Sequence, residues 1–191
     1  MKIKQAFDCD KVFFTSDTHF GHSNIIKYCN RPFKNAEEMN QALVDNWNKV
    51  VPPDGIVFHL GDFAFRTTNS AIKHIIESLN GQIYITWGNH DREKQIRKAL
   101  CKKLIVEADL LEITVKDDEL VDDYQKVVMC HYPLLAWHGN HRGYWQFFGH
   151  CHGNVESNKP VQIDVGVDVT NFTPLSWQDA KTIITKRALK R

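Results

Sequence analysis

The sequence has no apolar run that approaches the roughly 20 residues a helix needs to span a bilayer. Its most apolar long stretch, residues 104–115, is interrupted by Glu107, Asp109 and Glu112. The first ten residues carry two lysines but lack the apolar segment of a secretory signal. These absences predict a cytoplasmic protein with no membrane partner.

Paired cysteines and an excess of charge are also absent. The five cysteines are odd in number and show no paired spacing, which favours reduced thiols over a disulfide framework. Lysine and arginine total 24 and aspartate and glutamate total 23, so the net charge is only +1. A charge that small gives no electrostatic argument for binding long nucleic acid or a membrane surface.

What the chain does have is a globular composition and many histidines. Of its 191 residues, 42% are apolar and 25% are charged, which excludes a disordered or fibrous chain and suits one full core. No low-complexity linker, internal repeat or composition shift marks a domain boundary. Ten histidines are present, and their positions carry the functional argument.

The first half of the chain alternates short apolar runs with helical patterns. Asn35 lies three residues before Glu38, a spacing that resembles a capping box at the start of a helix. Strands joined through helices pair in parallel. The expected strands are 12–16, 56–59, 83–86 and 104–106, and the expected helices are 35–50, 71–79 and 92–101.

The second half is rich in expected strands, in an antiparallel or mixed arrangement. The acidic stretch 116–123 is typical of a solvated hairpin tip between two of them, and Ser176 caps a last helix over 177–189. The expected strands are 111–115, 126–130, 146–149 and 161–165. The fold class is therefore α/β, with two packed sheets and helices outside.

Metal-binding types of side chain follow the expected strands in sequence order. Because the carboxyl ends of adjacent strands meet at one edge of an α/β sheet, these side chains should converge on one crevice. Gly88 permits a tight turn, and two histidines spaced two apart face the same side of an extended segment. The full set is Asp17, His19, Asp62, Asn89, His90, Asp91, His131, His150 and His152.

The chemistry of the set indicates the class of metal. Leaving out His90 and Asp91, it offers four imidazoles, two carboxylates and one amide. That mixture suits Mn, Fe, Zn or Co better than Mg or Ca, which prefer oxygen alone. Seven ligands exceed what one ion takes beside a reactive water, whereas two ions sharing a carboxylate fit the count. Such pairs clamp the attacking and leaving oxygens of a displacement at phosphorus.

The ordered motifs resemble those of the calcineurin-like metallophosphoesterase superfamily. They are Asp17-x-His19, Gly61-Asp62, Gly88-Asn89-His90-Asp91, His131 and Gly149-His150-x-His152. Residues 13–22 and Asn30-Arg31-Pro32-Phe33 further resemble a small single-domain bacterial and phage subgroup. The resemblance implies one metallophosphoesterase domain over residues 1–191. It also implies a four-layer α/β/β/α sandwich of two mixed β-sheets flanked by helices.

The resemblance also assigns the seven ligands to two divalent ions, with Mn expected for assays in vitro. Its assignment is Asp17, His19 and His152 to the first ion, Asn89, His131 and His150 to the second, and Asp62 to both. A hydroxide held between the ions would then attack phosphorus, because the metals lower its pKa.

Two further residues are catalytic candidates through the same resemblance. His90 would donate a proton or hydrogen bond to the departing oxygen, and Asp91 would orient it. The chain departs from many family members by carrying Phe63-Ala64-Phe65, where an acidic residue often follows the Gly-Asp pair. It also has Asp91 where members often have glutamate. Neither departure removes a ligand.

Substrate contacts are expected outside the ligand set. His22, three positions after His19, could reach a phosphate or serve as a plain loop residue. Arg31 could pair with phosphate oxygens or lie at the surface. His141 and Arg142 belong to a glycine-containing loop at 137–142, where rim loops set specificity. His59, Cys130 and Cys151 are interpreted as core packing residues.

The leading hypothesis is a dinuclear-metal hydrolase that cleaves a small phosphodiester or a nucleotide. A phosphomonoesterase remains an alternative, as does a nuclease, although a long nucleic acid would need a basic surface that the charge of +1 does not supply. A catalytically silent scaffold that binds a partner protein is a third alternative, from another class. The oligomeric state, the metals bound in the cell and any closure of the 137–142 loop stay open.

Overall fold

The computed structural model describes residues 1–100, 103–155, 157 and 159–189, and these residues form two five-stranded sheets that face each other. The elements in chain order are β1 (Lys2–Asp8), β2 (Val12–Thr15), α1 (Ser23–Tyr28), α2 (Ala36–Val50), β3 (Ile56–His59), α3 (Asn69–Ser78), β4 (Gln82–Thr86), α4 (Glu93–Leu100), β5 (Leu104–Ala108), β6 (Leu110–Lys116), β7 (Tyr124–Cys130), β8 (Trp145–Phe148), β9 (Gln162–Asp164), β10 (Leu175–Ser176) and α5 (Trp177–Ala188), with short 3-10 helices at Cys9–Lys11 and Asn140–Arg142.

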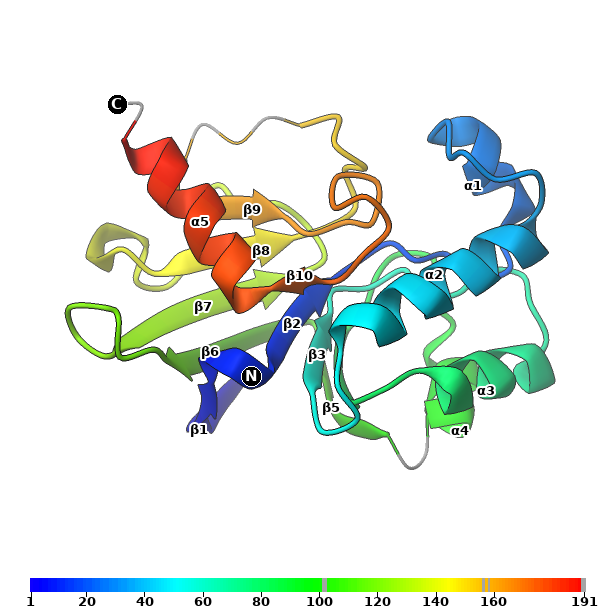
Figure 1. The fold of residues 1–191 in the computed structure, drawn as a ribbon, viewed down its shortest axis with the longest axis horizontal. Coiled ribbons are helices and arrows are strands. Elements are labelled where there is room, and N and C mark those ends of the chain that lie inside the picture. Colours follow the sequence, from blue (N-terminus) through cyan, green and yellow to red (C-terminus); the bar gives the residue numbers. More distant parts are fainter. Residues whose placement is uncertain (101–102, 156, 158, 190–191) are drawn as a thin grey trace.

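Both sheets are mixed, as the sequence predicts. The first, called the β2 sheet, has the order β10-β2-β3-β4-β5, with β2 to β5 parallel and β10 antiparallel. The second, called the β7 sheet, has the order β1-β6-β7-β8-β9, in which only the β6–β7 pair is antiparallel. Figure 1 shows the two sheets with helices beside them. The predicted α/β class and mixed-sheet sandwich are confirmed.

Local signals explain most of the elements. The side chain of Asn35 accepts a hydrogen bond from the Glu38 N–H at 2.8 Å, so the expected cap of α2 is present. Three elements were not expected: β1, α1 and β10. Strand β1 is an exposed edge whose sequence buries only Phe7, so it carries no alternating apolar pattern to detect. Helix α1 has six residues and β10 has two, and elements this short depend on tertiary contacts for their stability.

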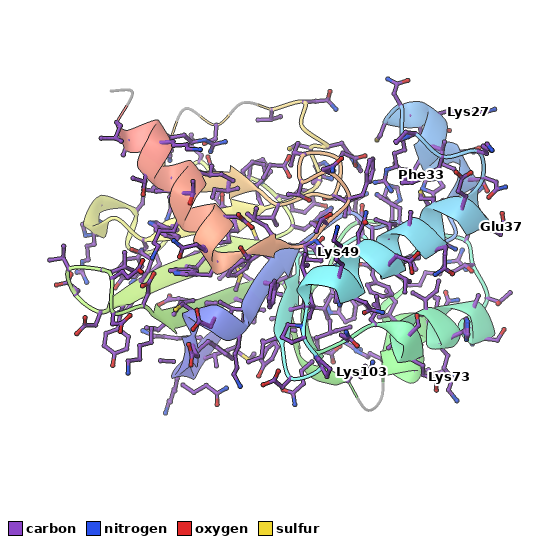
Figure 2. The ribbon with its side chains drawn as sticks, viewed as in Figure 1. Lys27, Phe33, Glu37, Lys49, Lys73 and Lys103 are labelled. Atoms are coloured by element: carbon purple, nitrogen blue, oxygen red, sulfur yellow. The ribbon has the colours of Figure 1, made fainter. Side chains whose placement is uncertain are left out.

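One apolar core lies between the β2 sheet and helices α1 to α4. Phe13, Val57 and Ile83 point from the strands into this layer, where Met39 and Trp47 of α2 meet them. Charged side chains such as those of Lys27 on α1 and Lys73 on α3 lie at the outside of the helices (Figure 2). The amphipathic pattern of the helices is therefore satisfied by one sheet face.

A second core fills the space between the two sheets. Phe14 of β2 stacks on Phe58 at 5.6 Å and meets Phe147 of β8 edge-on at 4.7 Å between ring centroids. Trp177 at the start of α5 stacks on Trp145 of β8 at 4.8 Å, which docks α5 beside β8 and β9 (Figure 1). These large rings fix how the two sheets sit on each other.

The other face of the β7 sheet carries polar side chains and is covered by the segment 132–144. Glu112 and Gln146 are buried there, on the side opposite to the inward-facing Phe147. Glu112 accepts from Nδ1 of His138 at 2.7 Å. Trp137 of the same segment is buried as well, at 8% exposed. Hydrogen-bonding groups thus take the place of an apolar helix contact on this face.

The described residues include no helix that is both long enough and apolar enough to cross a membrane. Among the described residues, Cys9, Cys29, Cys130 and Cys151 are free thiols, and Cys101 lies outside the described residues. Among the core interpretations, His59 is fully buried, with its Nε2 3.0 Å from the Thr18 hydroxyl and its Nδ1 accepting from the Gly61 N–H.

Candidate metal centre

The carboxyl ends of strands from both sheets meet at one edge of the molecule. Asp17 follows β2, Asp62 follows β3 and His131 follows β7. The Ser16–Gly166 bridge joins the two sheets directly at this edge. The loops after β2 and β3 are also joined through the main chain, since the His19 N–H donates to the Asp62 carbonyl at 2.9 Å. The predicted convergence of strand ends is therefore present.

Asp62 lies between two histidines that come from different sheets. Its Oδ2 is 3.5 Å from Nε2 of His19 and 3.5 Å from Nε2 of His131. Nε2 of His131 is also 3.1 Å from Oδ1 of Asn89, while its Nδ1 donates to the Leu60 carbonyl at 2.8 Å. One carboxylate oxygen thus faces both groups of ligands, which is the geometry a bridging ligand requires.

Asp17 lies close to the loop that carries His150 and His152. Its Oδ1 is 3.9 Å from Nε2 of His152, and its Oδ2 accepts from the His150 N–H at 2.9 Å. Two candidate groups consist only of predicted ligands, and in each the ligand atoms lie within 4.8 Å of one another. These groups are Asp17, His19 and His152, and Asp17, Asp62 and His131.

The burial of these groups fits the binding of a cation. Asp17 and His19 are 0% and 1% exposed. Among the residues that the structure describes, Oδ1 of Asp17 and both ring nitrogens of His19 have no hydrogen-bond partner. Burial raises the pKa of Asp17 to about 7, with Asp62 adding to the rise, and it lowers the pKa of His19. Leaving such atoms buried and unpaired is costly, and a divalent ion would offset that cost.

The main chain is strained at the same positions. A left-handed backbone is uncommon for residues other than glycine and collects at functional sites, where surrounding structure holds it in place. Here it turns the side chains that follow the strand ends toward one point. The residues and their φ angles are Asp17 (58°), His19 (50°), Asp62 (55°), His150 (67°) and His152 (47°).

Two glycines allow the loops to approach closely enough. A Cβ on Gly88 would clash with the Asp62 backbone and carboxylate, and a Cβ on Gly149 would clash with Ser16 and the Asp17 carboxylate. The sequence predicts a turn at Gly88, and the structure adds a packing role against the central carboxylate.

Asp168 was missed by the sequence analysis, although it lies against a predicted ligand. Its Oδ2 accepts from Nδ1 of His152 at 2.6 Å, which leaves Nε2 directed toward Asp17. Burial alone would raise the pKa of Asp168, but the bonds from His152 and Arg31 hold it below its ordinary value. For His152, burial lowers the pKa, but Asp168, Cys29 and the charge of Asp17 outweigh burial and raise the pKa to about 10. No sequence motif marks Asp168, because the pairing depends on the turn after β9.

Arg31 is buried behind the centre. Its guanidinium forms two 2.8 Å bonds with Asp168 and donates to the main-chain carbonyls of Asp17 and Thr18 at 2.8 and 3.1 Å. Arg31 is 4% exposed, so its N–H groups bond to atoms of the protein itself. We therefore propose a positioning role for Arg31 in place of the expected contact with substrate.

Asp91 also has a different set of partners from the expected one. Its two oxygens accept from the N–H groups of Asp62, Phe63 and Gly88 at 2.8 to 2.9 Å. Burial raises its pKa to about 7, against the effect of these bonds. The carboxylate ties the loop after β3 to the loop after β4. We therefore propose that Asp91 positions Asp62 rather than the His90 ring.

The remaining predicted residues divide between the pocket and the surface. His22, His90, His150 and His152 line a pocket of about 510 Å³ beside the candidate centre. The His90 ring lies 5.6 Å from the His19 ring, and the main-chain N–H of His90 donates to Oδ1 of Asp62 at 2.8 Å.

His141 and Arg142 are exposed in the short helix at 140–142, and neither is among the described residues that line this pocket. We therefore do not include these two side chains among the proposed substrate contacts.

Comparison with known proteins agrees with this geometry. A model of the calcineurin-like phosphoesterase family matches residues 10–186, nearly the whole chain. The chain belongs to this family. Membership accounts for the order of the ligand motifs along the strands and for the sandwich of two mixed sheets.

Several relatives are small proteins of similar length. The uncharacterized protein MJ1445 of Methanocaldococcus jannaschii is 36% identical over 189 residues, covering 95% of each chain. The Gene 66 protein of Mycobacterium phage L5 is 24% identical over 181 residues, or 82% of this chain and 86% of the phage protein. The crystal structure of AQ665 of Aquifex aeolicus, a protein of unknown function, has a TM-score of 0.67 at 23% identity. It covers 90% of this chain and 98% of that chain, and this likeness shows the fold alone.

Proposed function

We propose that the protein is a dinuclear-metal hydrolase that cleaves a small phosphodiester. The observation that carries the proposal is the position of Asp62, whose Oδ2 lies 3.5 Å from a histidine of each ligand group. The proposed ligands are those expected from the sequence: Asp17, His19 and His152 for one ion, Asn89, His131 and His150 for the other, and Asp62 for both. Mn, Fe, Zn and Co all suit this donor set.

Two divalent ions, when bound, would lower the pKa of a water molecule and neutralise charge on the phosphoryl oxygens. The protein itself holds its ligands in fixed positions and manages the leaving group. Asp168 and Arg31 fix the ring of His152, and Asp91 fixes the loop of Asp62. His90 is exposed at the pocket and can pass a proton to the departing oxygen.

The pocket has room for a substrate larger than inorganic phosphate. Its volume of about 510 Å³ lies within the range of small-molecule sites. The net charge of +1 gives no support for a long nucleic acid. We propose a cytoplasmic enzyme that acts as a single domain over residues 1–191.

Hydrolysis of bis-p-nitrophenyl phosphate and p-nitrophenyl phosphate with added Mn²⁺ tests the proposal. We expect turnover of the diester, and loss of that turnover in Asp62→Asn. Activity on the monoester alone would move the substrate class to a phosphatase. Absence of turnover with either ester, while calorimetry shows Mn²⁺ bound, would favour a catalytically silent scaffold.

A further inference from the structure

The pocket beside the candidate centre is lined by two unlike kinds of side chain. His19, Asp62 and His152 belong to the proposed metal ligands. Tyr28 and Phe65 are aromatic rings that no step of the proposed hydrolysis uses. The phosphoryl group would lie against the ligands, so the two rings are available for another portion of the substrate.

The two rings and His22 form a continuous surface, which we call the aromatic wall (His22, Tyr28 and Phe65). The His22 ring lies 4.4 Å from the Phe65 ring and 6.3 Å from the Tyr28 ring, between centroids. It also lies 5.3 Å from the ring of His19. The wall therefore begins at the candidate metal centre and extends outward along α1.

Core packing does not explain Tyr28. Helix α1 is anchored by Ile25, which is 4% exposed, whereas Tyr28 on the same helix is 72% exposed. Its ring meets that of His22 edge-on. A large ring left in water at the mouth of a pocket is a feature of surfaces that bind another molecule.

The position of Phe65 is fixed by the backbone. Phe63 and Ala64 beside it are buried, and the Phe65 N–H donates to the Phe20 carbonyl at 3.1 Å. The chain then turns at Arg66, whose φ is 51°. Phe65 is consequently held at the edge of the core, only half-buried, and facing the pocket. A ring fixed in this way is preorganised for stacking.

The wall lies on the side of the proposed leaving group. Phe65 and His90 are in edge-to-face contact at 5.0 Å between ring centroids, and the Arg66 guanidinium lies 5.2 Å from the Phe65 ring centre. A group attached to the departing oxygen near His90 would therefore meet Phe65 directly. An exposed cation beside this ring suits the π-electrons of a planar aromatic system.

We propose that the aromatic wall binds a planar aromatic ring carried by the phosphoester, such as a nucleobase or an aryl group. Stacking on such rings is tolerant of the exact ring and strong enough to set a preference. The substrate class is thus an aromatic phosphoester rather than a phosphorylated alkyl chain or sugar alone. This inference rests on the proposed function of the neighbouring centre.

Binding measured without turnover separates this inference from hydrolysis. Calorimetry on the Mn²⁺-loaded protein would compare phenylphosphonate, cyclohexylphosphonate and inorganic phosphate. The first two differ in aromaticity and planarity at nearly equal size, and the third reports the phosphoryl side alone. We expect phenylphosphonate to bind about five- to tenfold more tightly than cyclohexylphosphonate, the ratio that an aromatic contact supplies.

Substitutions then assign the preference to the wall. We expect Tyr28→Ala and Phe65→Leu each to remove most of the preference while leaving the affinity for inorganic phosphate unchanged. Tyr28→Phe, which keeps the ring, should retain the preference. Tyr124→Ala removes another exposed ring, which lies outside the pocket on β7, and should behave as the unmodified protein.

Three outcomes would overturn the inference. Equal affinities for phenylphosphonate and cyclohexylphosphonate in the unmodified protein would overturn it while leaving the phosphoesterase proposal intact. A preference that survives in both Tyr28→Ala and Phe65→Leu would show that the wall is not its source. Absence of binding by all three probes, inorganic phosphate included, would overturn the proposed function and this inference together.

Discussion

Asp62 is the residue on which the candidate centre depends most directly. It is 1% exposed, its two oxygens serve different neighbours, and its backbone is left-handed. Oδ1 accepts from the His90 N–H, while Oδ2 faces His19 and His131. Each nearby residue can therefore be tested for one of two effects, retention of metal or speed of turnover.

Asn89→Ala and His90→Ala should separate these two effects. Asn89→Ala removes the amide oxygen that lies 3.1 Å from Nε2 of His131, so the affinity for one ion is expected to fall by about 10- to 100-fold. His90→Ala should leave both ions bound and slow turnover by about 10²- to 10⁴-fold, most for poor leaving groups. Mn²⁺ calorimetry and a series of aryl diesters would measure the two quantities. Equal loss of metal in both variants would contradict the role given to His90.

Asp168→Asn tests the positioning of His152. The substitution keeps the shape but removes the negative charge that Arg31 and His152 share, so affinity at the first ion should fall about 10- to 100-fold. Mn²⁺ titration should show one weakened and one unchanged site, with circular dichroism confirming the fold. Arg31→Lys should give a milder form of the same result, because lysine cannot make the paired bonds. Two unchanged sites in folded Asp168→Asn would rule out this role.

At the scale of elements, α5 is joined to the tip region that follows β6 by one buried carboxylate. Asp117 is 2% exposed, and its Oδ2 accepts from Nε1 of Trp177 at 2.7 Å and from Nζ of Lys181 at 2.8 Å. Burial alone would raise the pKa of Asp117, but the Lys181 and Trp177 bonds hold it below its ordinary value. The ionised form is thus the one that stabilises the docking of α5.

Asp117→Asn should lower the free energy of unfolding by about 1–3 kcal/mol at pH 7, because charged hydrogen bonds are lost. A lowered folded-state pKa contributes stability above the unfolded value of about 3.9 and loses it as the pH falls through the folded value. The difference between variant and unmodified protein should therefore shrink in urea titrations below about pH 3.9. Asp54→Asn, which removes an exposed partner of Lys11, is the control and should change little. A difference that stays constant with pH would refute the assignment.

At the scale of the whole molecule, the candidate centre sits where the two sheets meet. Asp17 and Asp62 come from the β2 sheet, and His131 and His150 from the β7 sheet. An ion held by both sets would be bound by the folded chain and not by the unfolded one. Metal binding and global stability should consequently be linked.

Saturating Mn²⁺ should raise the free energy of unfolding, by about 2.7 kcal/mol for one site at a hundredfold excess over its Kd. Thermal unfolding with Mn²⁺ and with a chelator would measure the shift in Tm. Asp62→Asn should lose most of the shift, because it lacks the shared charge. A Tm that does not respond to Mn²⁺ in the unmodified protein would contradict the dinuclear centre.

The sequence was enough to predict most of the fold and the convergence of the strand ends at the candidate site. Apolar periodicity and the Asn35 cap located the main helices, and the short apolar runs located the strands whose ends carry the ligands. It could not predict β1, which buries only Phe7, since an edge strand is stabilised by its partner and not by its own pattern.

The sequence by itself determined which side chains could gather, because parallel strands bring their carboxyl ends to one edge whatever their separation along the chain. Only the tertiary structure decided what each neighbour does. Arg31 is buried against Asp168, the half-buried Asp91 accepts from the Asp62 loop, and Tyr28 and Phe65 line the pocket. These contacts depend on left-handed turns and on the pairing of residues as far apart as 31 and 168, and local sequence patterns predict neither.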